Sequence, residues 1–216
     1  MENKKNPCSV IFSDLMGTLI WRDEVSDDAL DIEVLKDFGL FDEALSGKYE
    51  VASKQSIKWL LREASVEQRA KIPHLFWIKM NEILSLGFDE KTLIKINDSF
   101  NDKLLDHLTV NTKLVRLIRS MRKCKVYTVM VTNSYHHLAD RILKRFPEIA
   151  GIFDEVYCAD DLMMKKSQGA LKHIMDKLGA DPKTCVIFGD DESEDGANEE
   201  VLFLKIMQDP SKYNKC

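Results

Sequence analysis

Asp14 is the residue whose type and position point most directly to chemistry. It follows the apolar run Val10-Ile11-Phe12-Ser13 and opens the loop Asp14-Leu15-Met16-Gly17-Thr18. Ligands of open parallel sheets bind beyond the carboxyl ends of the strands, so a carboxylate there lies where reactions usually occur. Taken alone, an aspartate in this position is more often a turn residue or a helix cap than a catalytic group. Its position after an apolar strand-like run favours a catalytic nucleophile.

Three more polar segments border strand-like or helical patterns further along the chain. They are Thr132-Asn133-Ser134 after residues 126–131, Lys165-Lys166 before a helix that reaches Leu178, and Gly189-Asp190-Asp191, with Asp195 downstream, after residues 185–188. An aspartate can attack phosphorus, provided that cations offset the negative charge of the phosphoryl group. Together these residue types suit phosphoryl transfer.

Each polar group can be given a part in that reaction. Carboxylates are hard oxygen ligands, so Asp190 and Asp195 are predicted to hold Mg²⁺, directly or through water. Thr132 is predicted to donate a hydrogen bond to the phosphoryl oxygens. Lys165 is predicted to neutralise their charge and to orient Asp14. An acidic surface loop is the alternative for the segment around Asp190.

Apolar periodicity indicates the elements that would position these groups. Strand-like runs occur at residues 10–12, 126–131, 155–158 and 185–188, with a weaker one at 202–207, and helical patterns at 135–146 and 169–178 lie between them. Alternating strands and helices predict an α/β fold with a parallel sheet.

Residues 23–108 contain no convincing strand pattern, and helical patterns cover 27–38, 53–64, 73–86 and 89–108. Pro73 suits the first turn of its helix. We therefore expect a helical insertion after the first strand, placed over the carboxyl ends of the strands.

The four ordered segments resemble those of the haloacid dehalogenase superfamily, in which strands end in an Asp-x-Asp-Gly-Thr loop, a Thr or Ser, a Lys, and a Gly-Asp with a second Asp downstream. The resemblance covers roughly residues 9–207. It implies a Rossmann-like core of residues 1–22 and 109–216, a helical cap of residues 23–108, and Mg²⁺ as cofactor. It also implies phosphatase activity on a small phosphorylated metabolite through an aspartyl phosphate.

The resemblance also extends the set of site residues. The metal ligands would be Asp14, the backbone carbonyl of Met16, Asp190 and Asp195. The usual interval in the family favours Lys165 over Lys166 as the motif lysine. Gly17, Thr18, Asn133 and Lys166 are expected to contribute to substrate binding.

Met16 departs from the family pattern, because a second aspartate would stand there. That acid protonates the leaving group and then activates water, and a thioether can do neither. Loss of such a group typically removes about 10²–10⁴ in rate, which favours substrates with good leaving groups. A catalytically silent binding protein is the main alternative. A metal-free dehalogenase is disfavoured by Asp190 and Asp195, and no cap lysine stands out for a phosphonatase.

Composition limits the class of partner and the compartment. The chain of 216 residues has 44% hydrophobic and 31% charged residues and a net charge of -5, so we expect no nucleic-acid or membrane partner. The five cysteines show no zinc-ligand spacing, and Cys124, Cys158 and Cys185 lie beside apolar runs, which favours reduced, buried thiols. No apolar leader is visible, and we expect a cytoplasmic protein.

Overall fold

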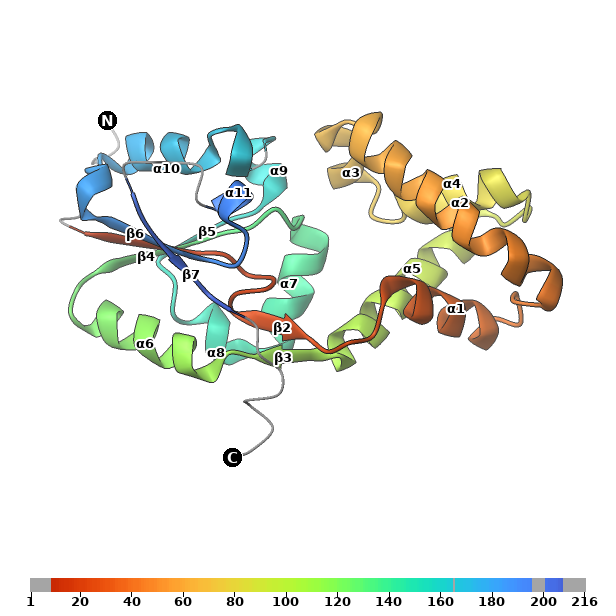
Figure 1. Ribbon diagram of the computed structural model, residues 1–216, viewed down its shortest axis with the longest axis horizontal. Coiled ribbons are helices and arrows are strands. Elements are labelled where there is room, and N and C mark those ends of the chain that lie inside the picture. The colour runs from red at the N-terminus through yellow and green to blue at the C-terminus, as the bar shows by residue number, and fades with distance from the viewer. Residues whose placement is uncertain (1–8, 165, 196–200, 208–216) are drawn as a thin grey trace. The chain divides into compact units, whose positions relative to one another are not determined.

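The computed structural model describes residues 9–164, 166–195 and 201–207. Figure 1 shows two compact units, one formed by Met1–Asp23 together with Leu108–Cys216 and the other by Glu24–His107. Each boundary lies one residue from the boundary expected from the sequence. The first unit holds a sheet with helices, and the second is helical in its described residues.

The first unit is built on a parallel sheet of five strands in the order β5-β4-β1-β6-β7. The strands are β1 (Val10–Ser13), β4 (Tyr127–Val131), β5 (Glu155–Tyr157), β6 (Cys185–Gly189) and β7 (Leu202–Lys205). The α/β fold with a parallel sheet predicted from the sequence is confirmed.

Strand β1 lies at the centre of this sheet. Val10 pairs with Tyr127 of β4 on one side and with Cys185 of β6 on the other, and all four residues of β1 are buried. A strand covered on both faces needs apolar residues without alternation, which is why the run before Asp14 is continuous.

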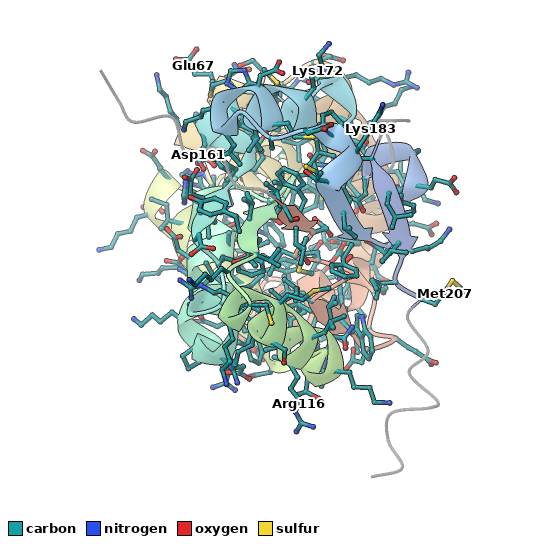
Figure 2. The ribbon with its side chains drawn as sticks, turned by 90° about the vertical axis from the view of Figure 1, so that its left-hand side faces the viewer. Glu67, Arg116, Asp161, Lys172, Lys183 and Met207 are labelled. Carbon is teal, nitrogen blue, oxygen red and sulfur yellow. The ribbon has the colours of Figure 1, made fainter. Side chains whose placement is uncertain are left out.

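Helices lie on both faces of the sheet (Figure 1). Helix α10 packs Leu171, Ile174 and Met175 against the apolar core of the strands on one face, and α6 lies on the other. Lys172 on α10 and Arg116 on α6 point outward on opposite sides (Figure 2). The helical segments of this unit are α6 (Thr112–Lys123), α7 (His136–Arg145), α8 (Pro147–Ala150), α9 (Ala159–Leu162), η1 (Lys166–Gln168), α10 (Ala170–Leu178), η2 (Pro182–Thr184) and α11 (Glu192–Asp195).

A second sheet, not expected from the sequence, pairs β2 (Ile20–Arg22) with β3 (Leu108–Val110) in antiparallel fashion. Strands of three residues are too short to show periodicity, and their pairing joins distant parts of the chain. Next to this ribbon, the Asn111 side chain caps α6 through the Leu114 amide (3.1 Å) and donates to the Thr18 carbonyl (3.2 Å). The β2–β3 pair thus lies where the chain leaves the first unit and returns to it, and the residue after β3 supports the loop after Asp14.

The second unit contains α1 (Asp27–Asp37), α2 (Glu43–Arg62), α3 (Val66–Lys71), α4 (Leu75–Leu84) and α5 (Glu90–Asp106). Its own core includes Leu35, Tyr49, Trp77, Met80 and Ile96. The expected helix 53–64 begins ten residues too late, because burial of Leu45 and Tyr49 outweighs the low helix propensity of Gly47. The expected helix 73–86 begins at Leu75, so Pro73 precedes its first turn rather than occupying it.

Cys158 and Cys185 are buried free thiols, as expected, whereas Cys124 is exposed because it caps the carboxyl end of α6. Cys8 and Cys216 lie outside the described residues. Among the described helices, none combines the length and the apolar character needed to cross a lipid bilayer.

Candidate active site

Three of the four polar segments end neighbouring strands. Asp14 follows β1, Thr132 follows β4, and Asp190 follows β6, and β1 lies between the other two. The chain runs from β1 to one side of the sheet through β4 and β5 and returns to the other side through β6 and β7. This reversal around β1 creates the crevice in which open α/β sheets bind ligands.

The Asp14 side chain lies buried at the centre of this edge, with 6% of its surface exposed. Its backbone N–H donates to the Phe188 carbonyl of β6 at 3.0 Å, which extends the sheet pairing by one residue. Its Oδ1 accepts a hydrogen bond from Lys166 Nζ at 2.7 Å. The carboxylate is therefore fixed in place and aimed at a cation.

Gly17 brings the loop after β1 close to Asp190. A Cβ added at Gly17 would lie 2.1 Å from Asp190 Oδ2, and Gly17 has a φ of +85°, which side chains rarely adopt. Thr18 Oγ1 donates to Asp190 Oδ1 at 3.4 Å. The absence of a side chain at Gly17 thus lets one carboxylate approach the backbone of the nucleophile loop.

Lys166 is the lysine that reaches Asp14. Its Nζ donates to Asp14 and also to Asp195, and only 5% of its surface is exposed. Lys165, to which the sequence assigned this part, lies outside the described residues. Lys166 was expected only to contribute to substrate binding, and its contacts give it the neutralising and orienting position instead.

Asn133 ties the lysine segment to the last acidic segment. Its Oδ1 accepts the Lys166 backbone N–H at 3.0 Å, and its Nδ2 donates to Glu194 Oε2 at 3.0 Å. Thr132 is buried, and its hydroxyl oxygen accepts the Ser134 N–H at 3.1 Å. The Thr132 hydroxyl proton is thus available to a ligand, while Asn133 positions the lysine segment from within the protein.

The acidic segment after β6 folds back so that Asp195 becomes almost fully buried, with 1% of its surface exposed. Its Oδ2 accepts the Asp191 N–H at 3.3 Å, and a Cβ on Gly189 would lie 2.2 Å from the same oxygen. A solvated acidic loop, the alternative considered from the sequence, would not bury a carboxylate in this way.

The donor set fits a divalent cation that prefers oxygen. Asp14, Asp190 and Asp195 each offer a carboxylate oxygen, and these oxygens lie within 4.8 Å of one another. Three carboxylates facing a single ammonium leave negative charge that a hard cation such as Mg²⁺ would balance. Met16 is half-buried beside them, and its carbonyl as a further ligand stays a prediction.

Burial governs the acidity of the site. Burial, supported by the charge of Asp195 and opposed by Lys166, raises the pKa of Asp14 to about 7. Burial also raises the pKa of Asp190. Burial by itself would lower the pKa of Lys166, but the charges of Asp14 and Asp195 outweigh it and raise that pKa, so the lysine stays protonated.

These acids open onto a cavity of about 300 Å³. Seven sequence-predicted residues line it: Asp14, Met16, Thr132, Asn133, Lys166, Asp190 and Asp195. Gly17 and Thr18 do not line it and act through Asp190. Ser134, Asp191 and Glu194 line it without having been predicted. These three residues belong to the polar segments that the sequence singled out, which could have indicated them as lining residues. Their side-chain directions, however, depend on how the loops fold.

As the pH is raised towards about 7, we expect the Mg²⁺ affinity of the metal-free protein to increase about tenfold per pH unit. Above about pH 7 the affinity should level off. The reason is that Asp14 has a pKa raised to about 7 and must lose its proton before it can bind a cation. Calorimetric titration in buffers of different ionisation enthalpy would measure both affinity and proton release. Asp14→Asn should remove the slope, and a flat wild-type profile would contradict the expectation.

Comparison with known proteins gives one family. Residues 8–197 match the family model described as haloacid dehalogenase-like hydrolase. No curated protein matches the chain by sequence.

Solved structures share the fold at low identity. A HAD family enzyme from Bacteroides thetaiotaomicron, in complex with magnesium and inorganic phosphate, is 17% identical with a TM-score of 0.64 over 95% of this chain and 98% of that one. A putative beta-phosphoglucomutase from Thermotoga maritima is 15% identical, with a TM-score of 0.63 over 93% and 86%. A 2-haloacid dehalogenase from Pseudomonas syringae pv. tomato is 17% identical, with a TM-score of 0.59 over 90% and 84%.

Proposed function

This chain belongs to the haloacid dehalogenase-like hydrolases, and from that premise we propose that it is a Mg²⁺-dependent phosphohydrolase in which Asp14 is the covalent nucleophile. The observation that carries the proposal is the environment of the buried Asp14 carboxylate. Its Oδ1 lies 2.7 Å from Lys166 Nζ, and two further carboxylates lie beside it. The substrate would be a small phosphorylated molecule, in keeping with a cavity of about 300 Å³.

In the first step, an Asp14 oxygen attacks phosphorus, the bond to the leaving oxygen breaks, and an aspartyl phosphate forms. Lys166 balances the charge of the phosphoryl oxygens and favours the ionised form of Asp14, and the Thr132 hydroxyl donates to one of those oxygens. Asp14, Asp190 and Asp195 would hold Mg²⁺, which supplies positive charge to the phosphoryl group. Water then attacks phosphorus, which releases inorganic phosphate and restores the Asp14 carboxylate.

Met16 restricts the substrates that this reaction can use. No proton donor stands at this position, so the leaving oxygen must depart as an anion or take its proton from water. Acyl phosphates, aryl phosphates and nucleotides meet that condition better than alkyl phosphates. The proposal is tested by assaying a panel of phosphorylated compounds of both kinds with and without Mg²⁺, and it fails if no phosphate release depends on the metal.

A second candidate function follows from the same residue. Without a general acid and base, the chain could be a catalytically silent relative that binds a phosphorylated ligand through Lys166 and Thr132. Robust wild-type turnover of p-nitrophenyl phosphate would exclude this function. Metal-independent turnover would instead favour the dehalogenase chemistry that Asp190 and Asp195 disfavour.

Met16→Asp is expected to increase the turnover of alkyl phosphates by about 10²–10⁴-fold, because it places a carboxyl group where the leaving oxygen needs a proton. The gain on p-nitrophenyl phosphate should be much smaller, since a nitrophenolate leaves without help. Steady-state kinetics on both substrates would measure the difference.

The matched control is Met207→Asp, because Met207 is exposed (Figure 2) and should leave both rates unchanged. Equal gains on the two substrates would contradict a proton-transfer role for position 16.

A further inference from the structure

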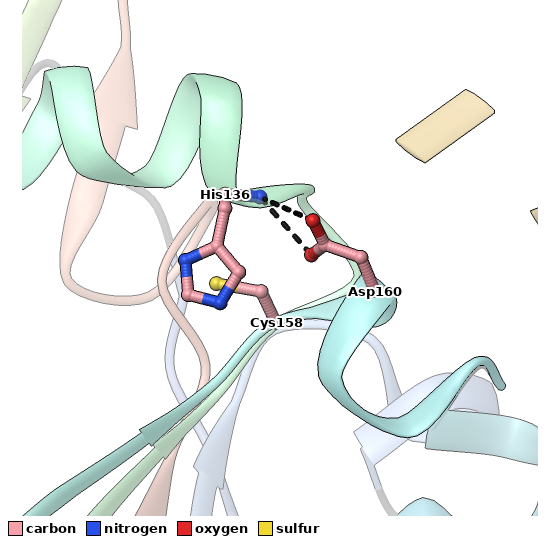
Figure 3. Close-up of side chains that lie close together, drawn as sticks. All are labelled: His136, Cys158 and Asp160. Atoms are coloured by element: carbon pink, nitrogen blue, oxygen red, sulfur yellow. Dashed lines mark hydrogen bonds between the residues drawn. The ribbon is translucent and has the colours of Figure 1, made fainter. Parts of the chain in front are cut away.

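A second cluster of metal-binding side chains lies outside the candidate active site. His136 begins α7, Cys158 caps the amino end of α9, and Asp160 lies in the first turn of α9. Each offers one donor atom, and the three atoms lie within 4.8 Å of one another. Figure 3 shows the Cys158 thiol beside the imidazole ring of His136, with the Asp160 carboxylate facing the start of α7.

We propose that His136, Cys158 and Asp160 form a binding site for a zinc-like transition-metal ion. Thiolate, imidazole and carboxylate are the ligands that Zn²⁺ takes in proteins, whereas Mg²⁺ avoids sulfur. The donor atoms of a tetrahedral zinc site are about 3.5 Å apart. The three donor atoms lie within 4.8 Å of one another, so binding a metal requires them to move closer together.

Hydrogen bonds already orient these ligands. His136 Nε2 lies 2.9 Å from Asp161 Oδ1, and the Asp161 Oδ2 accepts the Cys158 backbone N–H at 2.7 Å. The Asp161 carboxylate thus fixes the imidazole ring of His136 and the backbone of Cys158 relative to each other, as carboxylates near metal ligands commonly do. Asp161 is therefore a positioning residue in this proposal.

The Asp160 carboxylate keeps its structural part when it binds a metal. Both of its oxygens accept the His136 backbone N–H, at 3.1 and 3.3 Å, and so cap α7. A carboxylate has about four lone-pair positions, so one oxygen can cap the helix while the other binds a cation.

The cluster combines a ligand that solvent can reach with a ligand that is buried. Cys158 is buried, whereas the His136 side chain is 42% exposed. Asp140, Asp160 and Asp161 surround the ring with negative charge. Metal binding would release the thiol proton to water as the metal–sulfur bond forms.

The cluster is connected to the loop that carries Thr132. The Ala159 N–H donates to the Ser134 carbonyl at 3.0 Å, so the start of α9 holds the end of that loop. A metal that bridges α7 and α9 would therefore help to hold the loop that carries Thr132 in place. The metal would have three protein ligands, and the site would leave the proposed hydrolase chemistry unchanged.

Cobalt is the sharpest probe, because a thiolate ligand gives Co²⁺ a near-ultraviolet charge-transfer band that oxygen ligands do not give. Adding Co²⁺ to the metal-free, reduced full-length protein should produce this band at about one equivalent, and Zn²⁺ should abolish it. The lining of the Asp14 cavity includes the Met16 thioether but no cysteine thiolate, so that site cannot cause the signal.

Cys158→Ser should remove the band, and His136→Gln should weaken Co²⁺ and Zn²⁺ binding by at least about tenfold. The matched controls Cys124→Ser and His173→Gln change exposed residues of the same types and should keep the band and the affinity. Circular dichroism of the metal-free variants would check folding. If Cys158→Ser does not fold, the metal affinity of His136→Gln decides whether the cluster binds the ion.

Asp161→Asn separates positioning from ligation, because it should weaken binding while the charge-transfer band remains at saturating Co²⁺. No band in the wild-type protein would overturn the proposal. A band that persists in folded Cys158→Ser, or full affinity in His136→Gln, would overturn it as well.

Discussion

Asp14→Asn is expected to lower turnover by at least about 10⁴-fold, because the amide cannot attack phosphorus and no aspartyl phosphate can form. The buried position of Asp14, fixed by its backbone hydrogen bond to Phe188 and by Lys166, leaves no other described carboxylate in the same place. Steady-state kinetics with the best substrate of the panel would measure the loss.

The control Asp176→Asn changes an exposed aspartate on α10 and should keep full activity. Beryllium fluoride with Mg²⁺ should form a phosphoaspartate mimic with the wild-type protein and not with Asp14→Asn. Turnover of Asp14→Asn within tenfold of wild type would refute a covalent role for Asp14.

Asp14→Asn should also be more stable than the wild-type protein when both are free of metal. The pKa of Asp14 is about 7 in the folded protein, above its ordinary value of 3.8. Ionisation of this carboxyl therefore costs stability, and the cost grows as the pH rises from the ordinary pKa to the folded pKa.

The gain in melting temperature from Asp14→Asn should accordingly be larger near pH 8 than near pH 5. A gain of about 1 kcal/mol would raise the melting temperature of a protein of this size by about 2–4 °C. Thermal unfolding of both proteins in the presence of a chelator would measure it. A lower melting temperature for the variant at both pH values would contradict burial as the dominant influence on Asp14.

Lys166→Met is expected to reduce turnover by about 10²–10³-fold, since it removes the charge that balances the phosphoryl oxygens. It should also lower stability in the absence of metal by about 3–5 kcal/mol, because Asp14 and Asp195 then face each other without a cation. Kinetics at saturating Mg²⁺ and thermal unfolding with and without Mg²⁺ would separate the two effects. Added Mg²⁺ should recover stability but not turnover.

Lys172→Met is the matched control, because Lys172 points outward from α10 (Figure 2) and should change neither quantity. Lys165→Met tests the assignment that the sequence favoured. We expect it to reduce turnover far less than Lys166→Met, and the reverse order would restore Lys165 as the motif lysine.

The sequence predicted the sheet well for a physical reason. Strands β1, β4 and β6 are buried on both faces, so each is an unbroken apolar run that a single sequence reveals. The strands β2 and β3 escaped prediction, because three residues carry no periodicity and their pairing is between distant segments. Helix α2 was predicted too short, because its first half depends on packing of Leu45 and Tyr49 that propensity does not report.

By itself the sequence determined which polar residues follow which strands, since the order of apolar runs sets what the carboxyl edge of the sheet carries. That order predicts that Asp14, Thr132 and Asp190 lie together at the carboxyl edge of the sheet. The tertiary structure alone decided that Lys166 contacts Asp14 and Asp195, because two adjacent lysines in the sequence give no sign of which one reaches a given carboxylate. It alone also brought His136 to Cys158 and Asp160, since ligands on two separate loops have no spacing that a sequence displays.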